Sequence, residues 1–117
     1  HVSIAHRDGH AAAIVGDRGP VGIDLERIEP RKEGFDEIAF SPAERALLPE
    51  DARDEWRIRF WAAKEAAAKR RGTGLEGNPR SVSIDRIENE RIRCDGHWVD
   101  TRVEDGWVLA WTISEDE

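Results

Sequence analysis

The segment Val21-Gly22-Ile23-Asp24-Leu25-Glu26 decides how this chain of 117 residues folds. Apolar residues occupy every second position from 21 to 25, which is the period of a β-strand with two different faces. Asp24 and Glu26 stand two residues apart, so both carboxylates lie on the same face of that strand. One or two carboxylates are the usual protein contribution to a Mg2+ site. Taken alone, the pair is explained more simply by a solvated strand face.

Two more short strands are expected before this segment, at residues 2–5 and 11–16. Both stretches are mostly apolar, and Arg7-Asp8-Gly9 between them is typical of a hairpin turn that contains glycine. A second turn, at residues 17–20, ends in Gly-Pro and leads directly into the acidic strand. The sequence therefore predicts three strands at the beginning of the chain.

Helices are expected in the middle of the chain. A short helix is predicted over residues 34–40, and a second over 41–48 begins with a capping box formed by Ser41 and Glu44. The longest periodic segment, residues 51–71, is rich in alanine, arginine, lysine and glutamate, and its aromatic and alanine residues form a helical stripe.

After residue 74 the period of the apolar residues changes from that of a helix to that of a strand. Asp95-Gly96 and Asp105-Gly106 are the signals of hairpin turns between these strands. The expected fold class is therefore α+β, with an antiparallel sheet packed against one long and one or two short helices. The length of the chain favours a single domain over residues 1–117, and a domain excised from a longer chain is consistent with it.

Composition limits the partners of the chain. The net charge of −7 argues against a nucleic-acid partner, because such domains usually carry a basic excess. No apolar run is long enough to span a bilayer and no export leader is evident, so we expect no membrane partner. The single cysteine, Cys94, cannot form an internal disulfide, which agrees with a cytoplasmic location.

One face of the long helix carries side chains that suit the chemistry of phosphates. Trp61, Glu65 and Lys69 follow one another at four-residue spacing and therefore share a face, with Lys64 beside them. This face offers a third carboxylate for a metal and cations for phosphate groups. A surface helix with an ordinary ion pair between Glu65 and Lys69 would explain the same spacing.

Two separated motifs resemble the signature of the 4′-phosphopantetheinyl transferases. The first is Gly22-Ile23-Asp24-Leu25-Glu26, and the second, some thirty-five residues later, is the run from Phe60 to Lys69 with Gly72-Thr73-Gly74-Leu75 behind it. The upstream segment Ser3-Ile4-Ala5-His6 resembles the Ser-His segment of the larger, surfactin-synthetase-activating type. The resemblance covers roughly residues 1–75 and implies a transferase that moves 4′-phosphopantetheine from coenzyme A to a serine of an apo acyl or peptidyl carrier protein.

The resemblance also implies roles for the acidic residues. Asp24, Glu26 and Glu65 would bind Mg2+, and the ion would bridge the pyrophosphate of coenzyme A. Glu65, directly or through a metal-bound water, would take the proton from the carrier serine as it attacks the β-phosphate. Lys69 would contact the phosphates and, with Mg2+, would stabilise the departing 3′,5′-ADP.

Four further residues would bind coenzyme A if the resemblance holds. His6 would contact its 3′-phosphate, and Lys64 would assist phosphate binding in a secondary way. Gly72 and Gly74 would let the backbone turn close to the pantetheine arm. Where the larger type has small hydroxyl residues, this chain has Ala5 and Arg7, and Arg7 could replace a lost phosphate hydrogen bond.

The larger type consists of two similar halves, and this chain corresponds to the second half alone. Three arrangements stay open: a missing N-terminal half, a homotrimer as in the small holo-acyl-carrier-protein synthases, or a domain embedded in a polyketide or fatty acid synthase. The alternative function is a non-catalytic half-domain with a structural or carrier-docking role. The basic side chains that could dock a carrier are Arg45, Arg53, Arg57 and Arg59.

Overall fold

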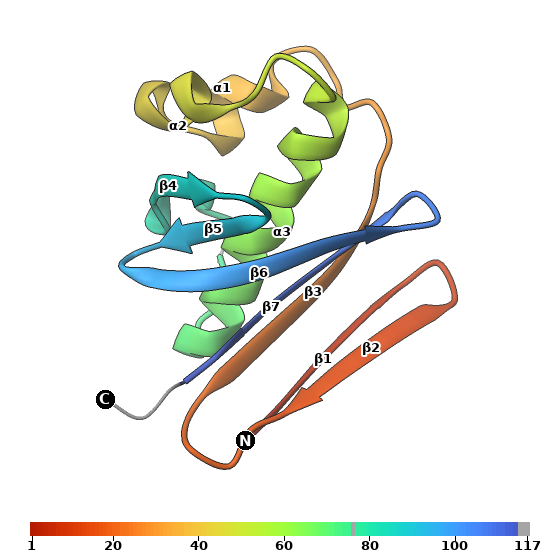
Figure 1. Cartoon of the computed structure of the whole chain (residues 1–117), viewed down its shortest axis with the longest axis vertical. Coiled ribbons are helices and arrows are strands. Elements are labelled where there is room, and N and C mark those ends of the chain that lie inside the picture. The colour runs from red at the N-terminus through yellow and green to blue at the C-terminus, as the bar shows by residue number, and fades with distance from the viewer. Residues whose placement is uncertain (76, 115–117) are drawn as a thin grey trace.

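The computed structural model describes residues 1–75 and 77–114, and the elements over these ranges follow the predicted order. Three strands come first, then three α-helices and a 3-10 turn, and finally four strands (Figure 1). Their bounds are β1 Val2–Arg7, β2 His10–Val15, β3 Val21–Arg27, α1 Phe35–Ala39, α2 Pro42–Leu47, α3 Arg53–Arg71, η1 Pro79–Ser81, β4 Ile84–Glu88, β5 Arg91–Cys94, β6 His97–Glu104 and β7 Trp107–Ile113. None of the helices within the described ranges is long and apolar enough to cross a bilayer.

The strands form two antiparallel sheets, which confirms the predicted α+β class. β1 and β2 pair only with each other, whereas the second sheet has the order β3-β7-β6-β5-β4. The acidic strand β3 therefore pairs with the last strand of the chain and lies at an edge of the larger sheet. Figure 1 shows α3 running along this sheet and the β1–β2 hairpin lying beside β3.

The two faces of β3 pack against different partners. Ile23 and Leu25 form a small apolar cluster with Ala5 of β1. Gly22, Asp24 and Glu26 occupy the opposite face, toward α3, because side chains alternate along a strand. Every residue from 21 to 26 is buried as a result, although the strand is at a sheet edge. The predicted acidic face is therefore not solvated but buried in the interface between β3 and α3.

Side chains cover the free edge of β3, where an unpaired strand would otherwise expose its backbone groups. The backbone N–H of Ile23 donates to Ser3 Oγ at 3.1 Å, and its carbonyl oxygen accepts a hydrogen bond from Lys69 Nζ at 2.9 Å. β1 and α3 therefore both attach to the same residue of the edge strand. These contacts fix the position of Lys69 relative to the two carboxylates of β3.

Gly22 sets how closely α3 approaches β3. A Cβ atom at Gly22 would lie 1.9 Å from the backbone carbonyl oxygen of Ala66 and 2.8 Å from the backbone nitrogen of Arg70. Real side chains never come so close, so only glycine permits this contact. Alanines on the helix, among them the fully buried Ala62 and Ala66, keep the facing surface equally small.

We predict that Gly22→Ala destabilises the fold by at least about 3 kcal/mol, because the added methyl group forces α3 and β3 apart. Urea unfolding followed by circular dichroism measures the change in the free energy of unfolding. Gly34→Ala is the control, since open space surrounds Gly34 and the cost there is only that of its left-handed backbone, about 1 kcal/mol. Equal losses in the two variants would contradict the close packing.

Candidate functional site

Three acidic side chains meet where β3 faces α3. Asp24 and Glu26 come from the strand and are 4% and 2% exposed. Glu65, from the middle of α3, is half-buried and acts electrostatically on Asp24, and Glu26 acts on Glu65 in the same way. The three carboxylates that the sequence predicts as metal ligands therefore lie within electrostatic range of one another.

Cationic side chains surround these carboxylates. Arg7 Nη2 lies 3.0 Å from Glu26 Oε2, and Arg31 Nη2 lies 3.5 Å from Glu26 Oε1. Lys69 Nζ lies 3.4 Å from Asp24 Oδ1. Each oxygen of Glu26 thus faces a guanidinium group, whereas the ion pair of Asp24 with the ammonium group of Lys69 is long.

The sequence interpretation did not identify Arg31 and gave Arg7 only a phosphate contact. Arg7 lies two residues after the buried Ala5, so alternation along β1 directs it toward β3. That periodicity was the available signal for Arg7. Arg31 follows the end of β3 in an irregular segment, where the sequence carries no periodic signal for the direction of a side chain.

The pKa values of two of the carboxyl groups are raised. Burial and then the neighbouring charge of Glu26 raise the pKa of Asp24 to about 8, although Lys69 opposes the shift. Burial is also the main cause that raises the pKa of Glu65, followed by the charge of Glu26, while Lys69 and Arg7 act in the opposite direction. The local cations therefore compensate the buried negative charge only in part.

The carboxylate oxygens of this site are of the kind that binds a hard cation such as Mg2+. The buried Asp24 Oδ2 accepts no hydrogen bond from any residue in the described part of the chain. This oxygen is therefore available as a ligand for a cation. No group of three or more His, Cys, Asp or Glu side chains in residues 1–75 and 77–114 stands in the arrangement of a metal cage. Asp24 and Glu26 fit the contribution that proteins commonly make to Mg2+, and the three-carboxylate site stays a prediction.

Lys64 does not belong to this site. Its ammonium group is fully buried and bonds Glu44 Oε1 at 2.8 Å and the backbone oxygens of Ala39 and Pro79 at 3.0 Å each. All three donors of the ammonium group are therefore used. Glu44 Oε2 in turn accepts the backbone N–H of Ile84 at 2.7 Å. The prediction that Lys64 assists phosphate binding is wrong, because this residue instead ties α3 to α1, α2 and η1, while its partner Glu44 reaches β4.

The structure places the other predicted ligand residues at the surface. His6 is exposed and alternates with Arg7 on β1, so it lies on the strand face opposite the carboxylates. Gly72 ends α3 with a φ of 90°, and the N–H groups of Gly72 and Gly74 both donate to the carbonyl of Ala68. No contact joins these three residues to Asp24 or Glu26 within the described chain, and their contacts with coenzyme A stay predictions.

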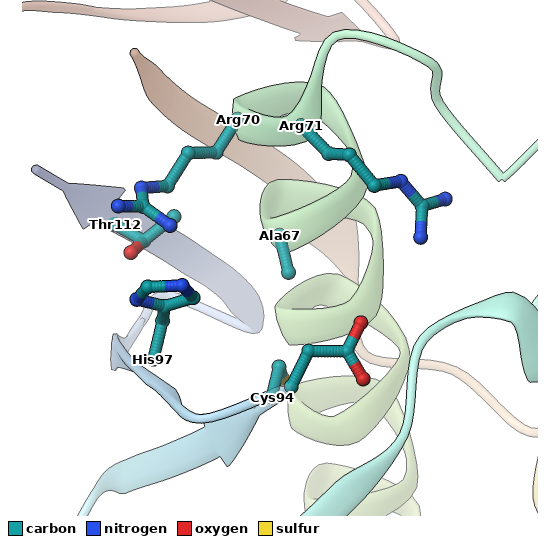
Figure 2. Close-up of a pocket in the computed structure, with 7 residues that line it drawn as sticks. Ala67, Arg70, Arg71, Cys94, His97 and Thr112 are labelled. Carbon is teal, nitrogen blue, oxygen red and sulfur yellow. The ribbon is translucent and has the colours of Figure 1, made fainter. Parts of the chain in front are cut away.

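The three basic residues that end α3 point in different directions. Lys69 reaches β3, Arg70 Nη2 donates to Ser114 Oγ at 3.1 Å, and Arg71 Nη1 donates to the backbone oxygen of Ser81 at 3.0 Å. Figure 2 shows the guanidinium groups of Arg70 and Arg71 directed away from each other around a pocket. The pocket is lined by Ala67, Arg70, Arg71, Cys94, Asp95, His97 and Thr112. Of this basic run, Lys69 is the residue that contacts the carboxylates of β3.

Four arginines were candidates for carrier docking, and the structure gives each an internal contact. Arg57 pairs with Asp36, and the buried Arg59 pairs with Glu55 and Glu90. The side chains of Arg45 and Arg53 donate to backbone carbonyls at the ends of α1 and α2. The charges of Arg57 and Arg59 are therefore neutralised within the chain. These two arginines would attract an acidic carrier protein only weakly.

The fold and the site define an α+β protein with a carboxylate pair, a third helical carboxylate and a lysine, a combination suited to the transfer of phosphate-containing groups. Comparison with known proteins makes the class specific. The sequence pattern of the 4′-phosphopantetheinyl transferase superfamily matches residues 20–113. The chain belongs to this superfamily.

Individual relatives agree with this assignment. The chain is 33% identical over 98 residues to the 4′-phosphopantetheinyl transferase ffp of Bacillus subtilis, an alignment that covers 81% of this chain and 43% of that protein. It is 36% identical over 96 residues to the L-aminoadipate-semialdehyde dehydrogenase-phosphopantetheinyl transferase of Eremothecium gossypii, covering 74% and 35% of the two chains. The solved structure of Thermotoga maritima holo-[acyl-carrier-protein] synthase is similar with a TM-score of 0.60 and 26% identity, over 79% of this chain and 60% of that one. The chain thus spans less than half the length of these two curated relatives.

The raised pKa of Asp24 predicts a pH-dependent stability. The folded chain keeps a proton on Asp24 up to about pH 8, whereas the unfolded chain releases it near the ordinary value of 3.8. The stabilisation from this group is therefore complete below about pH 4 and is lost as the pH rises toward 8. In buffer free of divalent cations, Asp24→Asn should flatten that decline in the free energy of unfolding.

The control for this experiment is Asp51→Asn, which changes an exposed aspartate in a turn. Urea unfolding of the three proteins at several values between pH 4 and 8 supplies the comparison. A decline in Asp24→Asn as steep as in the wild type and in Asp51→Asn would contradict the assignment to Asp24.

Proposed function

We propose that this chain transfers the 4′-phosphopantetheine group from coenzyme A to a serine of an apo acyl or peptidyl carrier protein, in the manner of a holo-[acyl-carrier-protein] synthase. The observation that carries the proposal is the contact of β3 with α3, which joins Asp24 and Glu26 to Glu65 and Lys69. The superfamily assignment supports phosphopantetheine transfer in general. Coenzyme A, Mg2+ and the carrier serine are the specific parts of the proposal.

Asp24, Glu26 and Glu65 are the residues that would hold Mg2+, which would supply neutralisation of the charge on the coenzyme A pyrophosphate. Burial and mutual repulsion raise the pKa of two of these carboxyl groups, and a cation bound beside them would offset both effects. The unpartnered Asp24 Oδ2 supports the same assignment.

Glu65 is the proposed general base. Its carboxyl group is only half-buried, so a serine of another protein can approach it, and its raised pKa makes it a better proton acceptor than an ordinary glutamate. Glu65 takes the hydroxyl proton while the serine oxygen bonds to the β-phosphorus. The bond from that phosphorus to the oxygen of 3′,5′-ADP breaks, and the positive charge of Lys69 stabilises the departing group.

A second polypeptide segment, either another half or another copy of this chain, would complete the coenzyme A site. The chain matches 43% and 35% of the two curated relatives, so a second half or further copies of this chain would supply the remaining wall of the coenzyme A site. One observation favours the alternative of a non-catalytic half-domain. Both oxygens of Glu26 already face arginines, as they would in a purely structural ion pair.

We predict that the chain adds a phosphopantetheine-sized mass to an apo carrier protein when coenzyme A and Mg2+ are supplied. Glu65→Gln should lower the rate by at least about a hundredfold, the usual range for loss of a general base. Intact-mass spectrometry of the carrier follows the reaction, and a chelated sample should show no transfer.

Glu88→Gln is the matched control, since it neutralises an exposed glutamate on β4 and should leave the rate unchanged. If transfer is absent, titration of coenzyme A separates two cases. Binding without transfer indicates a missing half or an unsuitable carrier, whereas the absence of both contradicts the proposed function and favours the structural half-domain.

A further inference from the structure

Glu26 is neutralised by the chain itself at the point where a metal ligand is expected. The carboxylate is almost fully buried, and its oxygens lie 3.0 Å from Arg7 Nη2 and 3.5 Å from Arg31 Nη2. Both contacts use the oxygens that a cation would need. The positive charge of both guanidinium groups therefore opposes a cation at Glu26 unless at least one of them withdraws.

The acidic and basic side chains of the site are equal in number before any ion binds. Three acidic side chains, Asp24, Glu26 and Glu65, are matched in number by three basic ones, Arg7, Arg31 and Lys69. A divalent cation added to this set gives an excess of positive charge, which is costly in a buried site. The excess disappears when an anion such as a diphosphate binds together with the cation.

Arg7 is the basic residue best able to move. Its side chain is 49% exposed, compared with 26% for Arg31, and it ends β1 immediately before the Asp8-Gly9 turn. Lys69 is held by the carbonyl oxygen of Ile23 at the edge of β3. A guanidinium group is also well shaped to bind phosphate oxygens in pairs.

We propose that Arg7 is an internal counter-ion that occupies Glu26 in the unliganded chain, yields it to Mg2+, and then pairs with a phosphate of the incoming ligand. This inference rests on the proposed function, because the ligand is taken to be coenzyme A. Arg7 leaves Glu26 most readily when a phosphate group is present to pair with its guanidinium group. The metal site then becomes free for Mg2+. Binding of the cation and binding of the anion are then coupled.

The coupling has two opposite consequences for a chain without Arg7. Mg2+ alone should bind more tightly, because nothing competes at that oxygen of Glu26. Coenzyme A should improve Mg2+ binding less than it does in the wild type, because the released guanidinium group is absent. A merely structural ion pair between Arg7 and Glu26 predicts neither a gain in metal affinity nor a loss of coupling.

The test is isothermal titration calorimetry of Mg2+ into the full chain, with and without coenzyme A, at constant ionic strength. For Arg7→Ala we expect Mg2+ alone to bind at least about fivefold more tightly than for the wild type, which is the lower end of typical coupling between sites. Coenzyme A should tighten Mg2+ binding at least about fivefold in the wild type and clearly less in Arg7→Ala. Arg7→Lys should lie between the two.

Arg27→Ala is the matched control. Arg27 follows Glu26 in sequence, its side chain is 45% exposed, and it lies near Asp8 and over Trp107, with no contact to the three carboxylates. Arg27→Ala removes one positive charge, as Arg7→Ala does, and should leave the affinity for Mg2+ as in the wild type. Equal affinities in Arg7→Ala and Arg27→Ala, or no Mg2+ binding by any of the proteins, would overturn the proposal.

The outcome is distinguishable from a failure of the proposed function. The titrations with Mg2+ alone involve neither coenzyme A nor a carrier protein. A chain that neither binds coenzyme A nor transfers its arm would refute the proposed function, while the two arginine variants would still report on the competition at Glu26.

Discussion

The close approach of α3 to Gly22 is the contact on which the site depends. The carbonyl oxygen of Ala66 occupies the space that a side chain at position 22 would fill. Glu65 precedes Ala66 on the helix, and Lys69 lies one turn further along the same face, so the contact also fixes these two residues beside β3. Asp24 and Glu26 then meet them on the facing strand. A small residue at one position thereby determines where four charged side chains come together.

This arrangement buries charge, and the chain compensates that burial with its own cations. Desolvation raises the pKa values of Asp24 and Glu65, which shows that the compensation is incomplete at these two groups. Glu26, in contrast, has an arginine at each oxygen. The second buried charge network, Lys64 with Glu44, has its hydrogen-bonding groups satisfied and holds helices and strands together. Two lysines five residues apart on one helix therefore have different environments, one beside Asp24 of β3 and one inside the fold.

Local sequence signals predicted most of the elements. The alternation in residues 21–26, the capping box of Ser41 with Glu44 and the Asp-Gly turns all have local physical causes, and each is confirmed. Pairing between distant segments had no such signal, so the pairing of β3 with β7 was not predicted. The predicted β1–β2 hairpin is confirmed, but its separation from the larger sheet was not predicted. In the site, helical spacing found Glu65 and Lys69. The burial of Lys64 was missed because its partner Glu44 already had an evident role as a capping residue.

We propose that the acidic face of β3 and the helix α3 together bind a cation and the phosphates of coenzyme A. Crystals grown with coenzyme A and Mn2+, in place of Mg2+, test it most directly, because the anomalous scattering of manganese locates the ion. We expect a manganese peak in contact with Asp24, Glu26 and Glu65, with Arg7 withdrawn from Glu26 toward a phosphate. Bound coenzyme A with manganese elsewhere, and with Arg7 still on Glu26, would contradict it.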